Sequence, residues 1–258
     1  MKDCDIIFVK KMNLSVVIIT LNEEVNIERC LKSAQWADEI LVYDSGSTDK
    51  TVAFAKSMGA SVIRGEWLGF GPTKNLAVLK AKNDWILSID ADEEIPSHLA
   101  DEILSLSTSL NIETVYKIPR LSYYLSRWVR HGGWYPDYQI RLFNRKKHNW
   151  NQALIHEKIE AKHQENLLNH LNHYVFNSIE HHIRTNNGYS TLLASKMVTE
   201  GKSFSWFHFL TKPVVKFLEC YLLKLGFLDG WVGYFIAKEA AHSVFLKWAK
   251  LKEMDIKK

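Results

Sequence analysis

The sequence lacks several features that would mark a secreted or nucleic-acid-binding protein. It has three cysteines, widely spaced and without a CxxC pair, so we expect no disulfide framework and a reducing cytoplasm. Residues 1–11 lack the long apolar core and the cleavage site of a signal peptide, and we interpret them as an extension outside the fold. The formal net charge is only +4, which gives no reason to expect a nucleic-acid partner.

Long uncharged apolar runs are also missing. The most apolar stretch near the C-terminus, residues 214–228, is interrupted by Lys216, Glu219 and Lys224. Because a spanning helix needs about 20 largely uncharged residues, we expect no transmembrane segment. Residues 206–248 instead mix lysines with Phe, Trp and Leu, as in helices that lie on an anionic membrane surface. The alternative is that these helices pack on the rest of the chain or on a second subunit of a homodimer.

Short apolar segments alternate with helical patterns in the first half of the chain. The expected strands are residues 14–20, 39–44, 61–64, 85–90 and 115–119, and the expected helices are residues 22–34, 47–59, 72–82 and 96–107. This order predicts βαβ units and an α/β, Rossmann-like fold whose mainly parallel sheet is flanked by helices. We therefore divide the chain into an α/β domain, residues 12–185, and a helical, aromatic and basic C-terminal region, residues 186–258.

Polar residues gather where three of the expected strands end. Thr20, Asn22 and Glu23 follow the first strand, residues 44–49 follow the second, and residues 90–93 follow the fourth. Because ligands of open α/β sheets bind beyond the carboxyl ends of the strands, we expect these side chains to form one site.

Asp90 and Asp92 form an Asp-x-Asp pair at the end of a buried strand. On an extended turn both carboxylates point to the same side, because side chains there repeat every second residue. Two carboxylates suit Mg²⁺ or Mn²⁺ that bridges a diphosphate. The alternative is an ordinary acidic loop before the helix near Pro96, but the place of the pair in the strand order favours the metal site.

Asp44 ends the second strand, where an acidic side chain often binds a ribose, as in NAD-dependent dehydrogenases. Such enzymes need glycines in the first strand–helix turn so that the pyrophosphate can approach the backbone. Residues 20–24 read Thr-Leu-Asn-Glu-Glu and contain no glycine, which excludes a dehydrogenase.

A glycine-containing segment precedes the third expected helix. Gly69 and Gly71 are followed by Lys74 and Asn75, an arrangement that would bring backbone N–H groups and a cation towards a phosphate or a donor sugar. The segment is not a Walker motif, and a plain loop with a helix cap is the alternative.

Four segments together resemble family 2 glycosyltransferases, which have the GT-A fold: residues 15–24, 44–49, 69–75 and 89–93. Later segments are similar to the bacterial branch that adds sugars to the lipopolysaccharide core: residues 131–137, 141–143, 155–157 and 226–230. The resemblance extends over nearly the whole chain, and its earlier segments are the more specific.

The resemblance implies inverting transfer of a hexose from a nucleotide-sugar, UDP-linked or similar, to a lipid-linked saccharide, with the lipopolysaccharide inner core as the leading acceptor. A polyprenyl phosphate or another envelope glycan is the alternative acceptor, and a nucleotide-binding module without turnover is the alternative of another class. The enzyme would be cytoplasmic, peripheral at the inner face of the cytoplasmic membrane. The expected donor-binding residues are Thr20, Asn22, Glu23, Asp44, Lys74, Asn75, Asp90 and Arg141, and Arg141 would contact phosphate or brace a loop.

The metal, Mg²⁺ or Mn²⁺, is expected on Asp90 and Asp92, with His156 as a further ligand. An HExxH zinc site is excluded because residue 160 is Glu160. The remaining histidines, His173 among them, lack a metal-ligand spacing, and we interpret most of them as structural or exposed.

Inversion needs a base that removes the proton of the acceptor hydroxyl. The Glu-Asp pair that many family members use for this purpose is absent from the sequence. Asp137, in the aromatic and glycine-containing loop of residues 132–138, is the preferred candidate, and Glu157 is the second.

Overall fold

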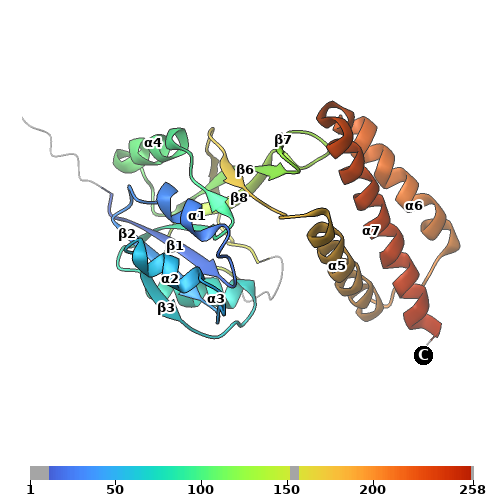
Figure 1. Cartoon of the computed structure of the whole chain (residues 1–258), viewed down its shortest axis with the longest axis horizontal. Helices are drawn as coiled ribbons and strands as arrows, with labels where there is room; N and C mark the ends of the chain where they lie inside the picture. The colour runs from blue at the N-terminus through green and yellow to red at the C-terminus, as the bar shows by residue number, and fades with distance from the viewer. Residues whose placement is uncertain (1–11, 152–156, 257–258) are drawn as a thin grey trace, which may run out of the picture. The chain divides into compact units, whose positions relative to one another are not determined.

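The computed structural model describes residues 12–151 and 157–256, and the chain divides into two compact units (Figure 1). The first unit extends to Arg120 and includes Tyr138–His173; the second consists of Leu121–Asp137 and the chain from Tyr174 onward. The strands are β1 (Leu14–Thr20), β2 (Glu39–Asp44), β3 (Ser61–Arg64), β4 (Trp85–Asp90), β5 (Glu93–Glu94), β6 (Thr114–Tyr124), β7 (Arg127–Val129), β8 (Asp137–Asn144), β9 (His163–Asn166) and β10 (Leu171–His173). The helices are α1 (Ile27–Ser33), α2 (Thr51–Ser57), α3 (Phe70–Leu79), α4 (Ser97–Ser105), α5 (Ile179–Thr199), α6 (Trp206–Leu218) and α7 (Gly230–Ile256), with short helical turns η1 (Leu106–Thr108), η2 (Glu219–Leu223) and η3 (Gly226–Asp229).

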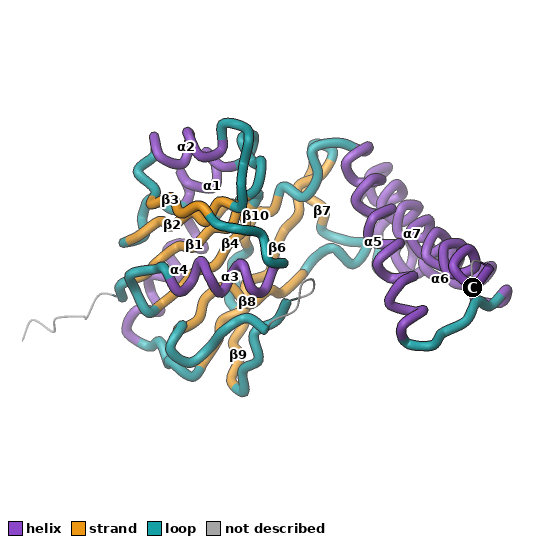
Figure 2. Tube along the Cα trace, turned by 90° about the horizontal axis from the view of Figure 1, so that it is seen from below, coloured by secondary structure: helices purple, strands orange, loops and turns teal. Residues whose placement is uncertain are grey.

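The strands form one mixed sheet in the order β3-β2-β1-β4-β8-β6-β10-β5, with β7 and β9 paired to β6. β1 pairs in parallel with β2 and β4, and β2 pairs in parallel with β3, so these strands lie side by side (Figure 2). β8 pairs with β4 in the antiparallel direction. The prediction of an α/β fold with a mainly parallel sheet and C-terminal helices is confirmed. On the edge of β4 that does not pair with β1, the sheet continues with the antiparallel strand β8.

Helices cover both faces of the parallel strands. Every residue of β1 is buried. Val16 and Ile18 belong to a core cluster that includes residues of α1 and α4, whereas Val17 and Ile19 belong to a second cluster with residues of α3. Because side chains alternate along a strand, the continuous apolar run fills both cores.

The first two helices begin later than predicted. α1 starts at Ile27 and not at Asn22, because Asn22 has a φ of 55° and leaves the helical conformation. The backbone N–H of Asn22 donates to Ser47 Oγ at 2.8 Å, and Asn22 Oδ1 accepts from the N–H of Thr48 at 2.9 Å. Ser47 and Thr48 are thereby bound to the loop after β1, and α2 starts at Thr51 and not at residue 47. These hydrogen bonds join the loop after β1 to the loop after β2, and they use the residues at which we expected the two helices to begin.

The two compact units do not follow the predicted division into residues 12–185 and 186–258. Residues 121–137 and 174–185 group with the C-terminal helices. The reason is a buried apolar cluster in which Tyr124 and Val129 pack with Val232 and Ile236 of α7. Such a contact between segments far apart in the sequence leaves no local pattern.

A polar pair lies in the same cluster. Tyr124 OH and His182 Nδ1 are 3.0 Å apart, and the ring of His182 stacks on Phe176 at 4.2 Å between centroids. Burial lowers the pKa of His182 to about 4, so the ring is neutral at pH 7. The pair joins β6 to α5 without introducing a buried charge.

Close backbone packing between α7 and η3 requires a glycine. A Cβ added at Gly233 would lie 1.8 Å from the carbonyl oxygen of Gly226. We expect Gly233→Ala to lower the free energy of unfolding by about 1–3 kcal/mol, because the backbone must shift to admit the methyl group. At Gly188, exposed on α5, an added Cβ meets nothing within 4 Å, so Gly188→Ala should raise it by up to about 1 kcal/mol. Denaturant unfolding of both variants measures the difference, and equal effects would contradict the packing argument.

The C-terminal helices are rich in apolar residues. Among the residues that the structure describes, no single helix combines the length and apolar character needed to cross a membrane. The segments Trp206–Leu223 and Gly226–Ile256, which meet at a bend of 72°, satisfy that criterion only when taken together.

Candidate functional site

The carboxyl ends of β1, β2 and β4 meet at one edge of the sheet. β1 lies between the other two strands, with Thr20 opposite Asp44 and Ile19 opposite Asp90. Because neighbouring strands are about 4.8 Å apart, Asp44 and Asp90 stand roughly 10 Å from each other. The structure therefore brings together the three strand ends at which we predicted the site.

Glu23 adds the loop after β1 to this acidic edge. Its pKa is raised by burial and by the negative charges of Asp92, Asp49 and Asp90, although the side chain of Asn26 donates to it at 2.8 Å. Mutual repulsion among carboxylates means that a bound cation would be stabilised at this edge. The predicted convergence of Glu23 with the Asp-x-Asp pair is present in the fold.

Asp44 is less accessible than its predicted ribose contact would suggest. It is 0% exposed, and its carboxylate accepts hydrogen bonds from the backbone N–H groups of Gly46 and Ser47 at 3.3 and 3.2 Å. Asp44 thus holds the loop that follows β2. Thr20 is also buried, at 5% exposed, and its hydroxyl has no hydrogen-bond partner among the described residues. The donor-binding roles of both residues stay predictions.

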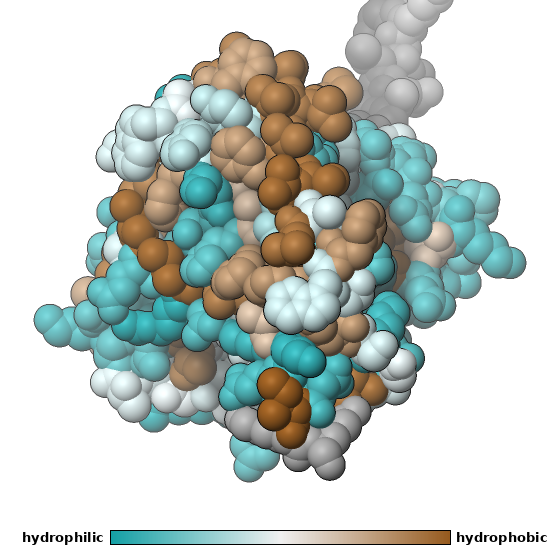
Figure 3. Space-filling view, turned by 90° about the vertical axis from the view of Figure 1, so that its right-hand side faces the viewer, coloured by the Kyte–Doolittle hydropathy of each residue, from teal (hydrophilic) through white to brown (hydrophobic). Residues whose placement is uncertain are grey.

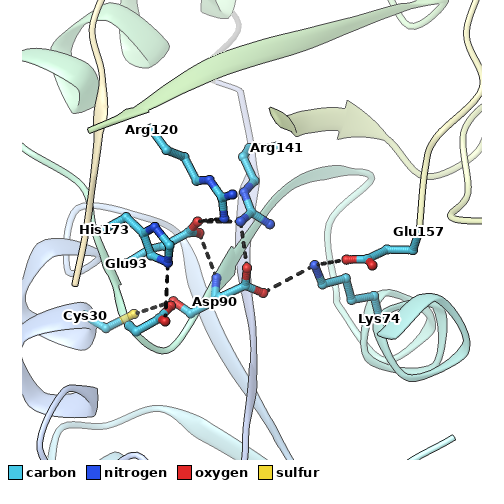
Figure 4. Close-up of polar contacts among 9 residues, drawn as sticks. Cys30, Lys74, Asp90, Glu93, Arg120, Arg141, Glu157 and His173 are labelled. Atoms are coloured by element: carbon cyan, nitrogen blue, oxygen red, sulfur yellow. Dashed lines mark hydrogen bonds and ion pairs between the residues drawn. The ribbon is translucent and has the colours of Figure 1, made fainter. Parts of the chain in front are cut away.

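Asp90 lies between two buried cations (Figure 4). Its Oδ2 accepts a hydrogen bond from Arg141 Nη2 at 2.7 Å, and its Oδ1 is 3.3 Å from Lys74 Nζ. Burial alone would raise the pKa of Asp90, but the charges of Arg141 and Lys74 outweigh it and hold that pKa well below its usual range. Arg141 is 3% exposed and Lys74 is 2% exposed. The Asp90 carboxylate is therefore ionised and fixed in place by the protein.

Glu93 is a site residue to which the sequence reasoning gave no role. It is fully buried, and its Oε1 is bound by Arg141 and lies 3.4 Å from Arg120 Nη1. Its Oε2 accepts from the backbone N–H of Asp90 at 2.9 Å. Arg141 bridges Asp90 and Glu93, and the phosphate or loop contact that we expected of it stays a prediction. A Glu placed directly after an Asp-x-Asp pair was the available signal.

Asp92 points to a different partner, His173. The Nε2 atom of His173 at the end of β10 lies 3.4 Å from Asp92 Oδ2, a contact that the sequence did not predict. Asp92 Oδ1 is buried and has no hydrogen-bond partner among the described residues. An oxygen left in this state is costly unless a ligand or ion binds it.

The fit to a divalent cation differs between the two aspartates. In the described part of the chain, no group of three or more His, Cys, Asp or Glu side chains is arranged to hold a metal ion. Asp92 fits Mg²⁺ or Mn²⁺ that takes further ligands from a diphosphate and water, as is usual for Mg²⁺. Asp90 fits less well, because both of its oxygens already face cations. His156, the predicted third ligand, lies outside the described residues.

Glu157 is brought to the site by Lys74. Its Oε1 lies 2.6 Å from Lys74 Nζ, and the same ammonium sits 4.7 Å from the ring centre of Trp150. Lys74 is on α3, within the helix expected over residues 72–82. Its side chain joins Asp90 to Glu157, which places the second candidate base next to the Asp-x-Asp pair.

Two other predicted site residues have different surroundings. The amide of Asn75 donates to the carbonyl oxygen of Trp150 at 2.8 Å and accepts from its N–H at 3.0 Å, so it anchors that segment. Asp137 is the first residue of β8 and is partly buried. It belongs to the second compact unit. The donor-binding role of Asn75 and the role of Asp137 as base stay predictions.

Comparison with known proteins places the chain among sugar transferases. The family described as glycosyl transferase family 2 matches residues 15–151. An uncharacterized glycosyltransferase of Rickettsia typhi is 34% identical, over 95% of this chain and 88% of the relative. The lipopolysaccharide core biosynthesis glycosyltransferase LpsC of Rhizobium meliloti is 27% identical, over 94% and 93% of the two chains.

Among solved structures, glucosyl-3-phosphoglycerate synthase from Mycobacterium tuberculosis, in complex with Mn²⁺, UDP and glucosyl-3-phosphoglycerate, has 25% sequence identity and a TM-score of 0.36. That similarity covers 44% of this chain and 45% of the synthase, so it spans less than half of either protein. The family match over residues 15–151 and the 34% identical relative are decisive, and they show that the chain belongs to glycosyl transferase family 2.

Proposed function

We propose that this glycosyltransferase moves a hexose from a UDP-linked donor to a saccharide acceptor, with inversion at the anomeric carbon. The observation that carries the proposal is that the two aspartates at the end of β4 have different partners. Asp92 keeps one buried oxygen without a protein partner, while Lys74 and Arg141 are buried beside Asp90. The first feature suits a metal ion, and the second keeps the site rigid beside a diphosphate.

Asp92 and His173 are the residues that would hold Mg²⁺ or Mn²⁺. When bound, the metal neutralises the negative charge that develops on the departing nucleoside diphosphate. Asp90 acts as a positioning residue in this scheme, since Arg141 donates to its Oδ2 and the Lys74 ammonium lies 3.3 Å from its Oδ1. Both cations come from regular elements, β8 and α3, and so they preserve the shape of the strand end when donor binds.

The acceptor hydroxyl must lose its proton as its oxygen bonds to the anomeric carbon and the bond to the diphosphate oxygen breaks. Glu157 is the base that the geometry favours, because Lys74 orients its carboxylate beside Asp90. Asp137, the candidate preferred from the sequence, is the alternative base in this proposal. Each would receive the proton directly, so replacing the true base by its amide separates chemistry from donor binding.

The acceptor in this proposal is a lipid-linked saccharide, with the lipopolysaccharide core as the leading case. The 27% identical LpsC, a lipopolysaccharide core biosynthesis glycosyltransferase that aligns with nearly the whole chain, supports that choice. A polyprenyl phosphate or another envelope glycan is the alternative acceptor. The corresponding location is the cytoplasm, at the inner face of the cytoplasmic membrane.

A donor panel tests the proposed chemistry without the natural acceptor. We expect Mn²⁺ together with UDP, or with one UDP-hexose, to raise the thermal unfolding temperature of the purified chain, because a ligand that binds only the folded state stabilises it. The matching UDP-hexose should also be hydrolysed slowly to UDP. Metal-dependent binding without UDP release, even after lipid-linked saccharide is added, would favour the non-catalytic module. No stabilisation by any nucleotide-sugar would contradict the proposal.

A further inference from the structure

Helices α6 and α7 carry an apolar surface that the described part of the chain leaves open to solvent. None of the 13 residues of α6 is buried. Trp206, Leu210 and Val214, spaced four residues apart on one face of the helix, are 65%, 63% and 58% exposed. Figure 3 shows apolar residues gathered in a band on the face that it presents. Contiguous apolar surface of this kind marks an interaction site.

The surface is hollowed between the two helices. Two cavities of about 330 and 360 Å³ share Pro213, Lys238 and Ala241, and they therefore form one continuous trough. Phe217 of α6 and Tyr234 of α7 line it with rings whose centres are 5.8 Å apart. The lining is apolar apart from Lys238, Glu239 and His242, and the side chain of Glu239 is only 12% exposed. A mainly apolar trough with an exposed lysine suits a hydrocarbon chain attached to an anionic group.

Charge in this part of the chain is mainly positive. Residues 201–256 contain eight lysines and five carboxylates. Glu219 already pairs with Lys216 at 3.1 Å, and Asp229 accepts from the backbone N–H of His131 at 2.8 Å. α6 itself has two lysines and no carboxylate. Lys238, in the trough, is exposed and has no ion-pair partner among the described residues. The apolar surface therefore includes an exposed positive charge, that of Lys238, which an anionic group could neutralise.

We infer that this surface binds an anionic phospholipid bilayer, with α6 in the interface, a lipid chain in the trough and a headgroup phosphate beside Lys238. Exposed Trp206 and Trp231, at 65% and 61%, are the side chains that favour a membrane interface. A second copy of the chain is the other conceivable partner, but a two-fold contact through this face would bring both copies of Lys238 into one apolar layer. Anionic lipid neutralises the same charge. The inference is independent of the transfer chemistry.

Vesicle flotation of the full chain tests the inference. We expect the protein to float with vesicles of phosphatidylcholine and phosphatidylglycerol, and more weakly with phosphatidylcholine alone. Phe207→Glu combined with Leu210→Glu should lower partitioning by about 100-fold, because each lost apolar contact is worth about tenfold or more. The matched control carries the same charges at Leu79 and Leu168 of the first unit, which are 71% and 88% exposed, and should float as the wild type does.

The electrostatic part is tested separately by Lys238→Gln. This variant should lose about fivefold in partitioning to the anionic vesicles and nothing to the neutral ones, since one lysine near an anionic surface is worth about 1 kcal/mol. Unchanged flotation of the Phe207/Leu210 variant would overturn the inference. So would conversion of a dimer to a monomer by that variant while its vesicle binding persists, because the face would then be a subunit interface. UDP binding by the same variants shows whether the donor site is intact.

Discussion

Asp92→Asn is expected to lower metal-dependent hexose transfer by about 10²–10³-fold, the cost of removing one group that stabilises developing charge. The amide cannot supply the negative oxygen that a hard divalent cation prefers. Asp92 Oδ1 is buried and has no hydrogen-bond partner among the described residues, so the loss falls on an atom that the protein itself does not use. The same variant should bind Mn²⁺ with UDP more weakly, which titration calorimetry measures without turnover.

The matched control is Asp84→Asn. Asp84 directly precedes β4, at the end of the strand opposite to Asp90, and its carboxylate pairs with Lys146 at the surface. This control should retain both Mn²⁺–UDP affinity and rate. His173→Ala should weaken metal-dependent UDP binding, because its Nε2 lies 3.4 Å from Asp92 Oδ2. Full metal-dependent affinity in both the Asp92 and His173 variants would rule out the proposed metal position.

Glu157→Gln is expected to lower kcat by about 10²–10⁴-fold while leaving donor affinity nearly unchanged, because an amide cannot accept the acceptor proton. The substitution keeps the size of the side chain, and Lys74 retains its contact with Asp90. Single-turnover transfer and UDP binding, measured on the same preparation, separate the two effects.

Glu160→Gln is the control for the Glu157 experiment, since Glu160 is exposed on the same segment. It should transfer hexose at the wild-type rate. Asp137→Asn is the competing test. If Asp137→Asn loses kcat with donor affinity intact while Glu157→Gln remains active, Asp137 is the base and our structural preference is wrong. Loss of donor affinity in Glu157→Gln would instead make Glu157 a support for Lys74.

The strand ends could be predicted because their signals are local. The four strands of the parallel sheet have the bounds expected from the sequence, since each is a short apolar run followed at once by polar residues. The helices that follow were harder to place. Asn is a residue type that often caps helices, but Asn22 accepts a hydrogen bond from Thr48 in the loop after β2. Nothing in the sequence around Asn22 indicates that contact.

His173 shows why part of the site could not be predicted. It lies far along the chain from Asp92 and in no recognisable motif. It reaches the site because β10 pairs antiparallel with β5, which sets His173 opposite Glu93. The register of two short strands, fixed by the fold as a whole, decides which histidine stands beside the carboxylate.

The sequence by itself determined the family, the α/β architecture and the acidic edge at which the donor is expected, because these depend on apolar runs and on residues next to them. Only the tertiary structure decided which side chains the acidic residues of this edge contact. It assigned Asp90 to Arg141 and Lys74, left an oxygen of Asp92 unbound, and joined residues 121–137 to the C-terminal helices. Those outcomes depend on the pairing of side chains from distant segments, and burial makes each pairing strong because water no longer competes for the charges.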